Sequence, residues 1–294
     1  MLRSPAASPS RRFAPQDQGG WASRNTRHDG GGGLAIYAIL YLAFLYVPVL
    51  LLPLFSFNDS AFITFPLTGF TTKWYAAMAG DEEMRAALAN TLKVGAAASL
   101  ISTILGLLTA KVLARGIRGG AFFAGFASLP LFIPDIVLGI ALLMLVTSLD
   151  IPLSLESVVV GHVAICLPFA IAVLLSRFEG FDLSLEEASR DLGENGWMTF
   201  WWVTFPLVLP GIVASLLLTF IVSFDDFLIA FFLCGTDTTL PVYIWGELRF
   251  PYKLPNVLAL GATILIASSA LIALAEWVRR QGVSGSPRDH GIGI

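Results

Sequence analysis

Charged side chains are scarce in this sequence. They make up 13% of its 294 residues, whereas 56% of the residues are hydrophobic. Soluble domains carry about one quarter charged residues, so a water-soluble core could not absorb this much apolar surface. Because backbone groups inside a bilayer must be hydrogen-bonded within their own segment, long apolar runs predict helices. The composition therefore predicts an all-α integral membrane protein, and the net charge of -3 indicates no particular partner.

Motifs for catalysis and for nucleotide or metal binding are also missing. The sequence has no Gly-x-x-x-x-Gly-Lys-Ser/Thr loop, so we do not expect this chain to bind ATP itself. It has no His-Glu-x-x-His, Cys-x-x-Cys or Gly-x-Ser-x-Gly motif either. Cys166 and Cys234 lie in apolar runs and are expected to be small buried thiols, and the isolated His162 is expected to be packed. We therefore predict no enzyme activity, no metal and no cofactor in this chain.

What the sequence does contain is a series of apolar runs, each long enough to cross about 30 Å of hydrocarbon. They predict about six transmembrane helices: Leu34 to Phe57, Ala86 to Leu113, Ala121 to Leu149, Val158 to Phe178, Leu207 to Cys234 and Val257 to Val278. Lysine and arginine are concentrated on one side, which predicts that both termini are cytoplasmic.

The same pattern divides the chain into three regions. Residues 1–33 are rich in Arg, Ser, Pro and Gly and lack the apolar content to fold alone, so they are predicted to be a disordered cytoplasmic tail. Residues 34–280 form the predicted transmembrane domain, and residues 281–294 a second cytoplasmic tail. The segments 81–83 and 235–255 are predicted to lie outside.

Several predicted spans contain proline or small residues. Pro134 and Pro210 are examples of prolines that remove a helix hydrogen bond and allow a kink. Gly95 and Gly106 in the second span allow close approach of neighbouring helices, where lipid provides no hydrophobic driving force. No internal repeat is evident, which argues against an inverted-repeat secondary transporter.

A polar segment, residues 179–206, separates the fourth and fifth predicted spans on the predicted cytoplasmic side. Ser184 with Glu187 three residues later forms a capping box, which predicts a short helix that continues to Leu192. Gly193 follows as a left-handed C-cap. The segment is therefore predicted to be folded rather than a flexible tether.

A second short helix is predicted in the same segment, from Trp197 to Phe205, where Pro206 should stop it. Trp201 and Trp202 belong to this helix. Indole rings are common at membrane interfaces, so these tryptophans are expected to be anchors at the inner interface.

The spacing of this segment resembles the EAA signature of binding-protein-dependent ABC import permeases. That signature reads Glu-Ala-Ala, three residues, Gly, nine residues, Ile, any residue, Leu-Pro; here the corresponding residues are Glu187-Ala188-Ser189, Gly193 and Val203-Thr204-Phe205-Pro206. The departures at Ser189, Val203 and Phe205 are mild changes of size.

The resemblance implies a role for these residues. In the family the EAA helix is the coupling helix, which docks into a cleft on the ATPase subunit. It therefore implies that ATPase coupling depends on Glu187, Ala188, Ser189, Gly193 and Pro206. Their chemistry agrees with that role, because a small Ala188 permits close docking and Glu187 can pair with a cation on the partner.

Further motifs are similar to the second permease subunit of spermidine/putrescine-type importers: Phe70 to Tyr75, Pro134 to Val137, Ser223 to Phe227 and Leu240 to Ile244. The resemblance implies a type I ABC importer permease-like bundle, multi-pass in the bacterial inner membrane. Its implied partners are a homologous second permease subunit, a dimer of ATP-binding subunits that bind ATP and Mg, a periplasmic substrate-binding protein and membrane lipid. No nucleic acid is expected. The implied substrate is a small organic cation, with a polyamine first and an amino-acid-like compound or opine as alternatives.

Acidic residues inside predicted spans are costly and indicate function. Asp135 lies about 21 Å from the cytoplasmic end of its span, and Asp225 and Asp226 about 27 Å, so all three belong to the outer half. They could form a substrate pathway that attracts a cation, with Trp245 adding a cation-π contact. Alternatively, Asp135 satisfies the backbone broken at Pro134 and the Asp225-Asp226 pair closes a helix end.

Two interpretations from other classes remain open on the sequence alone. A cation-coupled secondary transporter could use the same three aspartates as a relay. An intramembrane aspartyl enzyme would need two carboxylates around one water, and the sequence lacks the Gly-x-Gly-Asp stretch typical of such enzymes.

Overall fold

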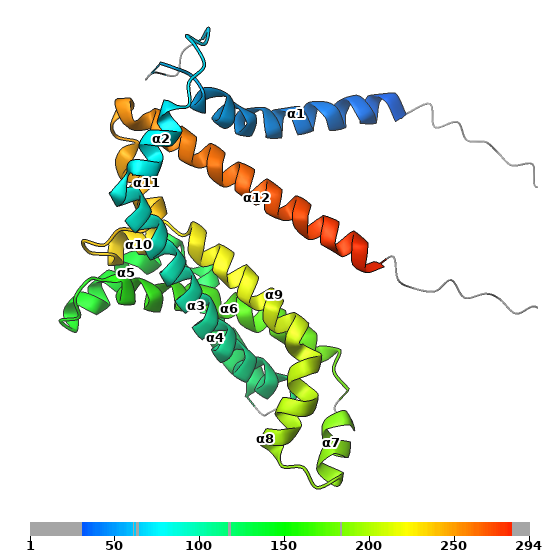
Figure 1. Cartoon of the computed structure of the whole chain (residues 1–294). Helices are drawn as coiled ribbons and strands as arrows, with labels where there is room; N and C mark the ends of the chain where they lie inside the picture. Colours follow the sequence, from blue (N-terminus) through cyan, green and yellow to red (C-terminus); the bar gives the residue numbers. More distant parts are fainter. Residues whose placement is uncertain (1–30, 61, 63–64, 117–118, 183, 284–294) are drawn as a thin grey trace, which may run out of the picture. The chain divides into compact units, whose positions relative to one another are not determined.

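The computed structural model describes residues 31–283 except 61, 63–64, 117–118 and 183, and the described chain is helical (Figure 1). Its α-helices are α1 (Gly31–Ser56), α2 (Lys73–Gly80), α3 (Glu82–Ala114), α4 (Gly120–Ala127), α5 (Asp135–Ser148), α6 (Leu155–Glu179), α7 (Ser184–Asp191), α8 (Gly196–Thr199), α9 (Phe205–Asp225), α10 (Leu228–Leu233), α11 (Leu240–Glu247) and α12 (Leu254–Val283). The short helices η1 (Leu129–Phe132) and η3 (Pro251–Lys253) are 3-10 helices, and η2 (Phe200–Thr204) is a π-helix. The predicted all-α class is confirmed.

Five helical segments of the described chain are long and apolar enough to cross a membrane: Gly33–Ser56, Glu82–Ala114, Leu155–Glu179, Gly196–Asp225 and Pro251–Ala270. The predicted continuous span from Ala121 to Leu149 is wrong. It is divided into α4, η1 and α5, and α5 has only 14 residues. Pro130 and Pro134 cause the division, because each lacks a backbone N–H and restricts the residue before it.

The boundaries predicted around α9 also need correction. The apolar run Leu207 to Cys234 is not one helix, because α9 ends at Asp225, Asp226 is extended, and α10 begins at Leu228. At the other end Pro206 does not stop a helix. It lies in the first turn of α9, directly after η2, where the Phe205 N–H bonds to the Phe200 carbonyl. The wider π-helical turn accommodates the proline ring and its missing donor.

Helix α3 packs closely against α6 and α9. A Cβ atom added to Gly106 would lie 2.7 Å from Ala170 Cβ on α6, and one added to Gly95 would lie 3.0 Å from the Phe220 ring on α9. The prediction that small residues in the second span allow close approach is therefore confirmed. At the same packed interface the hydroxyls of Thr103 and Ser215 lie 3.1 Å apart.

The two ends of α3 contact different segments of the chain. At its N-terminal end the Tyr243 hydroxyl donates to Asp81 Oδ2 over 2.8 Å, and Asn90 Nδ2 donates to the Thr238 carbonyl over 3.2 Å. At its C-terminal end Arg115 pairs with Glu186 in α7. The segments predicted to lie outside therefore meet at one end of α3 and the predicted cytoplasmic loop lies at the other, as the predicted topology requires.

The predicted tails, residues 1–33 and 281–294, lie outside the described residues except at their inner borders. Residues 31–33 begin α1 and residues 281–283 end α12. Helix α1 is a single apolar helix of 26 residues. The cytoplasmic location of both termini stays a prediction.

Candidate functional site

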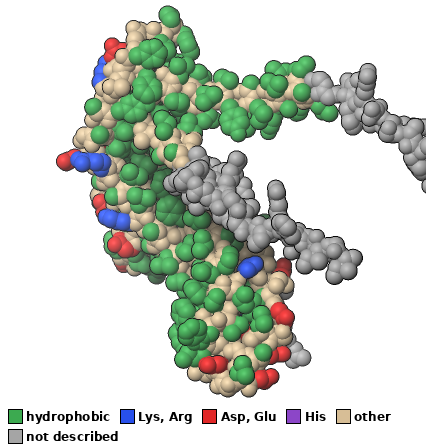
Figure 2. All heavy atoms as spheres, turned by 45° about the vertical axis from the view of Figure 1, so that its right-hand side comes forward, with side chains coloured by type: hydrophobic (Ala, Val, Ile, Leu, Met, Phe, Trp, Pro, Cys, Tyr) green, Lys and Arg blue, Asp and Glu red, His purple; other side chains and the backbone are tan. Residues whose placement is uncertain are grey.

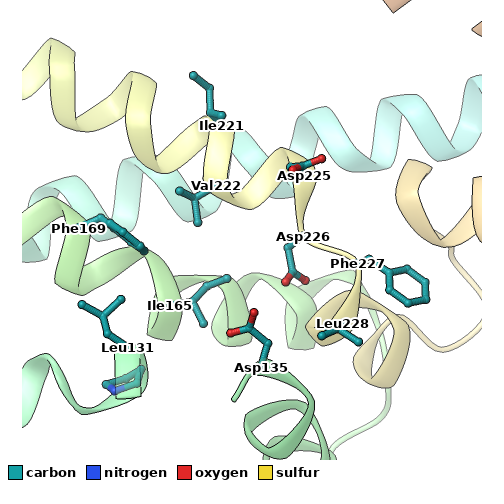
Figure 3. Close-up of a pocket in the computed structure, with 11 residues that line it drawn as sticks. Leu131, Asp135, Ile165, Phe169, Ile221, Val222, Asp225, Asp226, Phe227 and Leu228 are labelled. Carbon is teal, nitrogen blue, oxygen red and sulfur yellow. The ribbon is translucent and has the colours of Figure 1, made fainter. Parts of the chain in front are cut away.

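The three aspartates that the sequence places inside predicted spans line one cavity of about 610 Å³. Figure 3 shows which elements carry them: Asp135 lies at the start of α5, Asp225 at the end of α9, and Asp226 at the break before α10. The walls are apolar and aromatic, formed by Pro130, Leu131, Ile165, Phe169, Ile221, Val222, Phe227 and Leu228. The structure thus brings Asp135 together with the adjacent pair Asp225 and Asp226, which lies far from it in the sequence.

Asp226 is held by hydrogen bonds from the protein itself. Its Oδ2 accepts hydrogen bonds from the backbone N–H groups of Ile229 and Ala230, each with an N···O distance of 3.1 Å. The carboxylate therefore caps α10. His162 Nε2 also lies 3.1 Å from Asp226 Oδ2, and His162 Nδ1 lies 2.7 Å from Ser223 Oγ. His162 is 1% exposed, as expected for a packed histidine, but the sequence did not reveal its partners. For Asp226 the helix-end alternative describes the geometry.

Asp135 and Asp225 differ from Asp226 in their exposure. Both are exposed, whereas the Asp226 side chain is 8% exposed. Asp135 is the first residue of α5, where the positive end of the helix dipole favours a carboxylate. In Figure 3 its carboxylate is turned toward Asp226 across the cavity. The cavity therefore has two accessible acids and one that is fixed by the fold.

Trp245 is not among the residues that line this cavity. It lines a second cavity of about 510 Å³, together with Glu83, Asp237 and Arg249. Its ring packs against Phe227, with 5.4 Å between centroids, and Phe227 lines the first cavity. Trp245 is therefore separated by one aromatic ring from the aspartates with which the sequence grouped it.

The polar segment between α6 and α9 folds as the sequence predicted in its main features. Helix α7 ends at Asp191, and Gly193, which follows it, has a left-handed φ of 92°. The Gly193 N–H donates to the Arg190 carbonyl and the Glu194 N–H to the Ser189 carbonyl, which together form a Schellman motif. The expected capping box is wrong, because Ser184 N donates instead to Asp182 Oδ1 over 3.0 Å. The Asp182 carboxylate does the capping that was assigned to Ser184.

Most residues of the EAA-like motif are on the surface. Glu187, Ala188, Gly193 and Pro206 are exposed, and the Ser189 hydroxyl lies 3.1 Å from that of Thr199. Figure 2 shows acidic side chains gathered at the lower tip, where Figure 1 places α7 and α8. The exposed acids between α6 and α8 are Asp182, Glu187, Asp191 and Glu194.

Sequence reasoning missed Glu186, which is 5% exposed. Its carboxylate accepts from Thr204 Oγ1 over 2.6 Å and pairs with Arg115 Nη2 at 2.5 Å and Lys111 Nζ at 3.5 Å. Burial alone would raise the pKa of Glu186, but the Thr204 hydroxyl and the two cations lower it below its ordinary value. The available signal was the pair Lys111 and Arg115, which lie on one helix face at the cytoplasmic end of the second span.

Comparison with known proteins places these features in one family. The family described as binding-protein-dependent transport system inner membrane component matches residues 102–281. This chain is a member of that family. The permease is 32% identical over 262 residues to the spermidine/putrescine transport system permease protein PotC of Escherichia coli strain K12, covering 88% of this chain and 97% of that protein. It is 33% identical over 251 residues to the putrescine transport system permease protein PotI of the same strain, covering 82% and 88%.

A solved structure shares the fold of the permease. It is the crystal structure of a bacterial ABC transporter involved in the import of the acidic polysaccharide alginate, with a TM-score of 0.66 and 20% identity, covering 87% of this chain and 98% of the other. The predicted ABC importer permease fold is confirmed. The chain is an inner-membrane permease subunit and not an enzyme, and an aspartyl enzyme or a secondary transporter is not supported.

Proposed function

We propose that this permease subunit moves a small organic cation, specifically a polyamine such as spermidine or putrescine, across the inner membrane as part of an ATP-driven importer. The observation that carries the proposal is the convergence of Asp135, Asp225 and Asp226 on one cavity. Acids at membrane depth are retained where they serve a substrate path. The relatives PotC and PotI are described as polyamine permeases, which supports the same substrate class.

The cavity suits both parts of a polyamine. Its accessible carboxylates, Asp135 and Asp225, can attract ammonium groups, and its aromatic wall residues Phe169 and Phe227 can contact methylene groups and add cation-π attraction. Two opposite charges 4 Å apart attract by about 4 kcal/mol at an effective dielectric of 20. Asp226 contributes negative potential while its oxygen stays bonded to α10.

The remaining machinery is proposed to come from partners. These are a homologous second permease, a dimer of ATP-binding subunits that bind ATP and Mg, and a periplasmic substrate-binding protein. Closure of the ATPase dimer would push on α7 and α8, and the two permeases would then rock between inward and outward states. The exposed acids of α7, with Leu192 at 88% exposure and Trp197 at 69%, fit a partner surface that is basic and apolar.

The proposal is tested by reconstituting the complete complex in proteoliposomes and measuring ATP-dependent uptake of labelled putrescine and spermidine. We expect Asp135→Asn and Asp225→Asn each to raise the apparent KM, because the amide keeps the shape but removes the attraction. Asp150→Asn is the matched control, since Asp150 is exposed, lines neither cavity described above, and has a φ of 54° that asparagine tolerates. Polyamine uptake that is absent, or equal in all variants, would refute the proposed substrate.

A further inference from the structure

Helix α7 has one residue buried against the rest of the chain, and that residue is Glu186. An unpaired buried carboxylate would be strongly destabilising. Here both oxygens are occupied: Oε1 by the Thr204 hydroxyl and Lys111, and Oε2 by Arg115 at 2.5 Å and, more loosely, by Arg190 at 3.9 Å. The attachment of α7 therefore depends on a charged cluster rather than on apolar packing.

The partners of Glu186 belong to separate elements. Lys111 and Arg115 mark the C-terminal end of α3, and Thr204 is the last residue of the π-helical turn η2 that leads into α9. Lys111 also lies over the Phe200 ring in η2, with Nζ 4.6 Å from the centroid. We name Glu186, Lys111, Arg115 and Thr204 the Glu186 clasp.

The clasp connects α7 to two long helices, α3 and α9. Helix α9 continues from Thr204 to Asp225, which lines the acidic cavity, and α3 packs along both α6 and α9. A π-helical turn such as η2 is often a site of functional adjustment. A rigid link between α7 and both helices would therefore connect the loop surface to the cavity walls.

We propose that Glu186 is a positioning residue, which makes α7, the end of α3 and the start of α9 move as one body when the ATPase acts on the loop. This inference rests on the proposed function, because it requires that α7 receives the movement of an ATPase subunit. Glu187 at the surface would meet the partner, whereas Glu186 carries the movement into the bundle. The two neighbouring glutamates would thus have different roles.

The first test compares Glu186→Gln with the matched control Glu179→Gln in the reconstituted complex. Glutamine keeps the size and an acceptor for Thr204 but loses the attraction to Lys111 and Arg115. Glu179 is exposed and lines a small cavity of about 170 Å³ together with Lys111, Arg115 and Glu186, and among the described residues it forms no ion pair with the clasp. We expect Glu186→Gln to lower uptake per ATP hydrolysed by about fivefold or more, because coupling between two sites typically changes an equilibrium by at least that factor. Glu179→Gln should leave this ratio unchanged.

Charge reversal distinguishes positioning from simple structural support. Glu186→Arg and Arg115→Glu should each uncouple transport, and the double variant should restore uptake per ATP because it re-forms the pair with opposite polarity. If Glu186→Gln instead lowers only the yield and Tm of the complex, while the surviving complex keeps the wild-type uptake per ATP, the proposal is wrong.

A distance measurement separates this inference from the choice of substrate. Spin labels at Leu185→Cys in α7 and Leu108→Cys in α3, both exposed positions, report whether the two elements move together. In the complex we expect one narrow distance that is the same with and without ATP, and a broad, ATP-dependent distribution in Glu186→Gln. Unchanged distances in Glu186→Gln would refute the positioning role of Glu186. Failure of polyamine uptake together with the expected distances would refute only the proposed substrate.

Discussion

The adjacent acids Asp225 and Asp226 should respond in opposite ways to the same substitution. Asp226→Ala removes the acceptor for the Ile229 and Ala230 N–H groups and leaves His162 Nε2 without its neighbour. Loss of a helix cap costs about 0.5 to 2 kcal/mol, and leaving the buried N–H groups of Ile229 and Ala230 without an acceptor adds about 1 to 3 kcal/mol. We therefore expect Asp226→Ala to destabilise the permease by about 2 to 4 kcal/mol.

Asp225→Ala is the matched comparison. Asp225 is exposed, and substitutions at exposed positions without special contacts change stability by about 0.5 kcal/mol or less. Thermal unfolding of the purified complex in detergent should show a Tm lower by about 5 to 10 °C for Asp226→Ala and near wild type for Asp225→Ala. Uptake should show the reverse pattern in the complexes that survive, with the larger rise in KM in Asp225→Ala. Equal Tm values for the two variants would refute this division of roles.

Three further predictions concern packing, the loop and pH. Gly106→Ala should lower the Tm, because its Cβ would lie 2.7 Å from Ala170 Cβ and overpacking costs about 1 to 3 kcal/mol. The control Gly125→Ala should leave the Tm unchanged, because nothing lies within 4 Å of the added Cβ. Equal Tm values for the two variants would contradict this. Gly193→Ala should weaken ATPase stimulation, since its left-handed φ of 92° disfavours a side chain by about 1 to 2 kcal/mol. Gly193→Asn should be milder, and equal stimulation in both variants would count against a role for the turn. The lowered pKa of Glu186 predicts a pH dependence of stability. The clasp should contribute its full stability above the unfolded-state pKa of about 4.3 and lose it as the pH falls through the lower pKa of the folded state. A wild-type Tm advantage over Glu186→Gln that vanishes already at pH 6 would contradict this prediction.

The long helices could be predicted from the sequence because hydropathy reports directly what a bilayer requires. Hydropathy did not locate the broken spans, since it does not record whether a backbone N–H exists; only Pro134 and the alternative that the Asp225-Asp226 pair closes a helix end indicated them. The run that contains Pro130 and Pro134 is apolar except for Asp135 and three hydroxyl side chains, yet its helix is interrupted. The run through Asp225 and Asp226 is likewise apolar except for the two acids, and the break lies at those acids.

The residues of the EAA-like motif could be predicted from the sequence, whereas Glu186 could not. Glu187, Ala188, Ser189 and Gly193 follow a local spacing, which a sequence displays. Glu186 is defined instead by Arg115, which lies 71 residues away along the chain. Contacts of that kind depend on the packing of α3 against its neighbours. For the same reason the sequence could group the three aspartates by depth, but it could not place Trp245 in a different cavity.

The central claim is that accessible carboxylates in the acidic cavity select a polyamine, and the most direct test varies the charges of protein and substrate together. Uptake of putrescine and of N-acetylputrescine, which has one charge fewer, would be measured with the wild-type complex and with the double variant Asp135→Asn, Asp225→Asn. The account predicts that wild type prefers putrescine by about tenfold or more, corresponding to about 1.4 kcal/mol, and that the double variant loses most of this preference. The same preference in both complexes would contradict it.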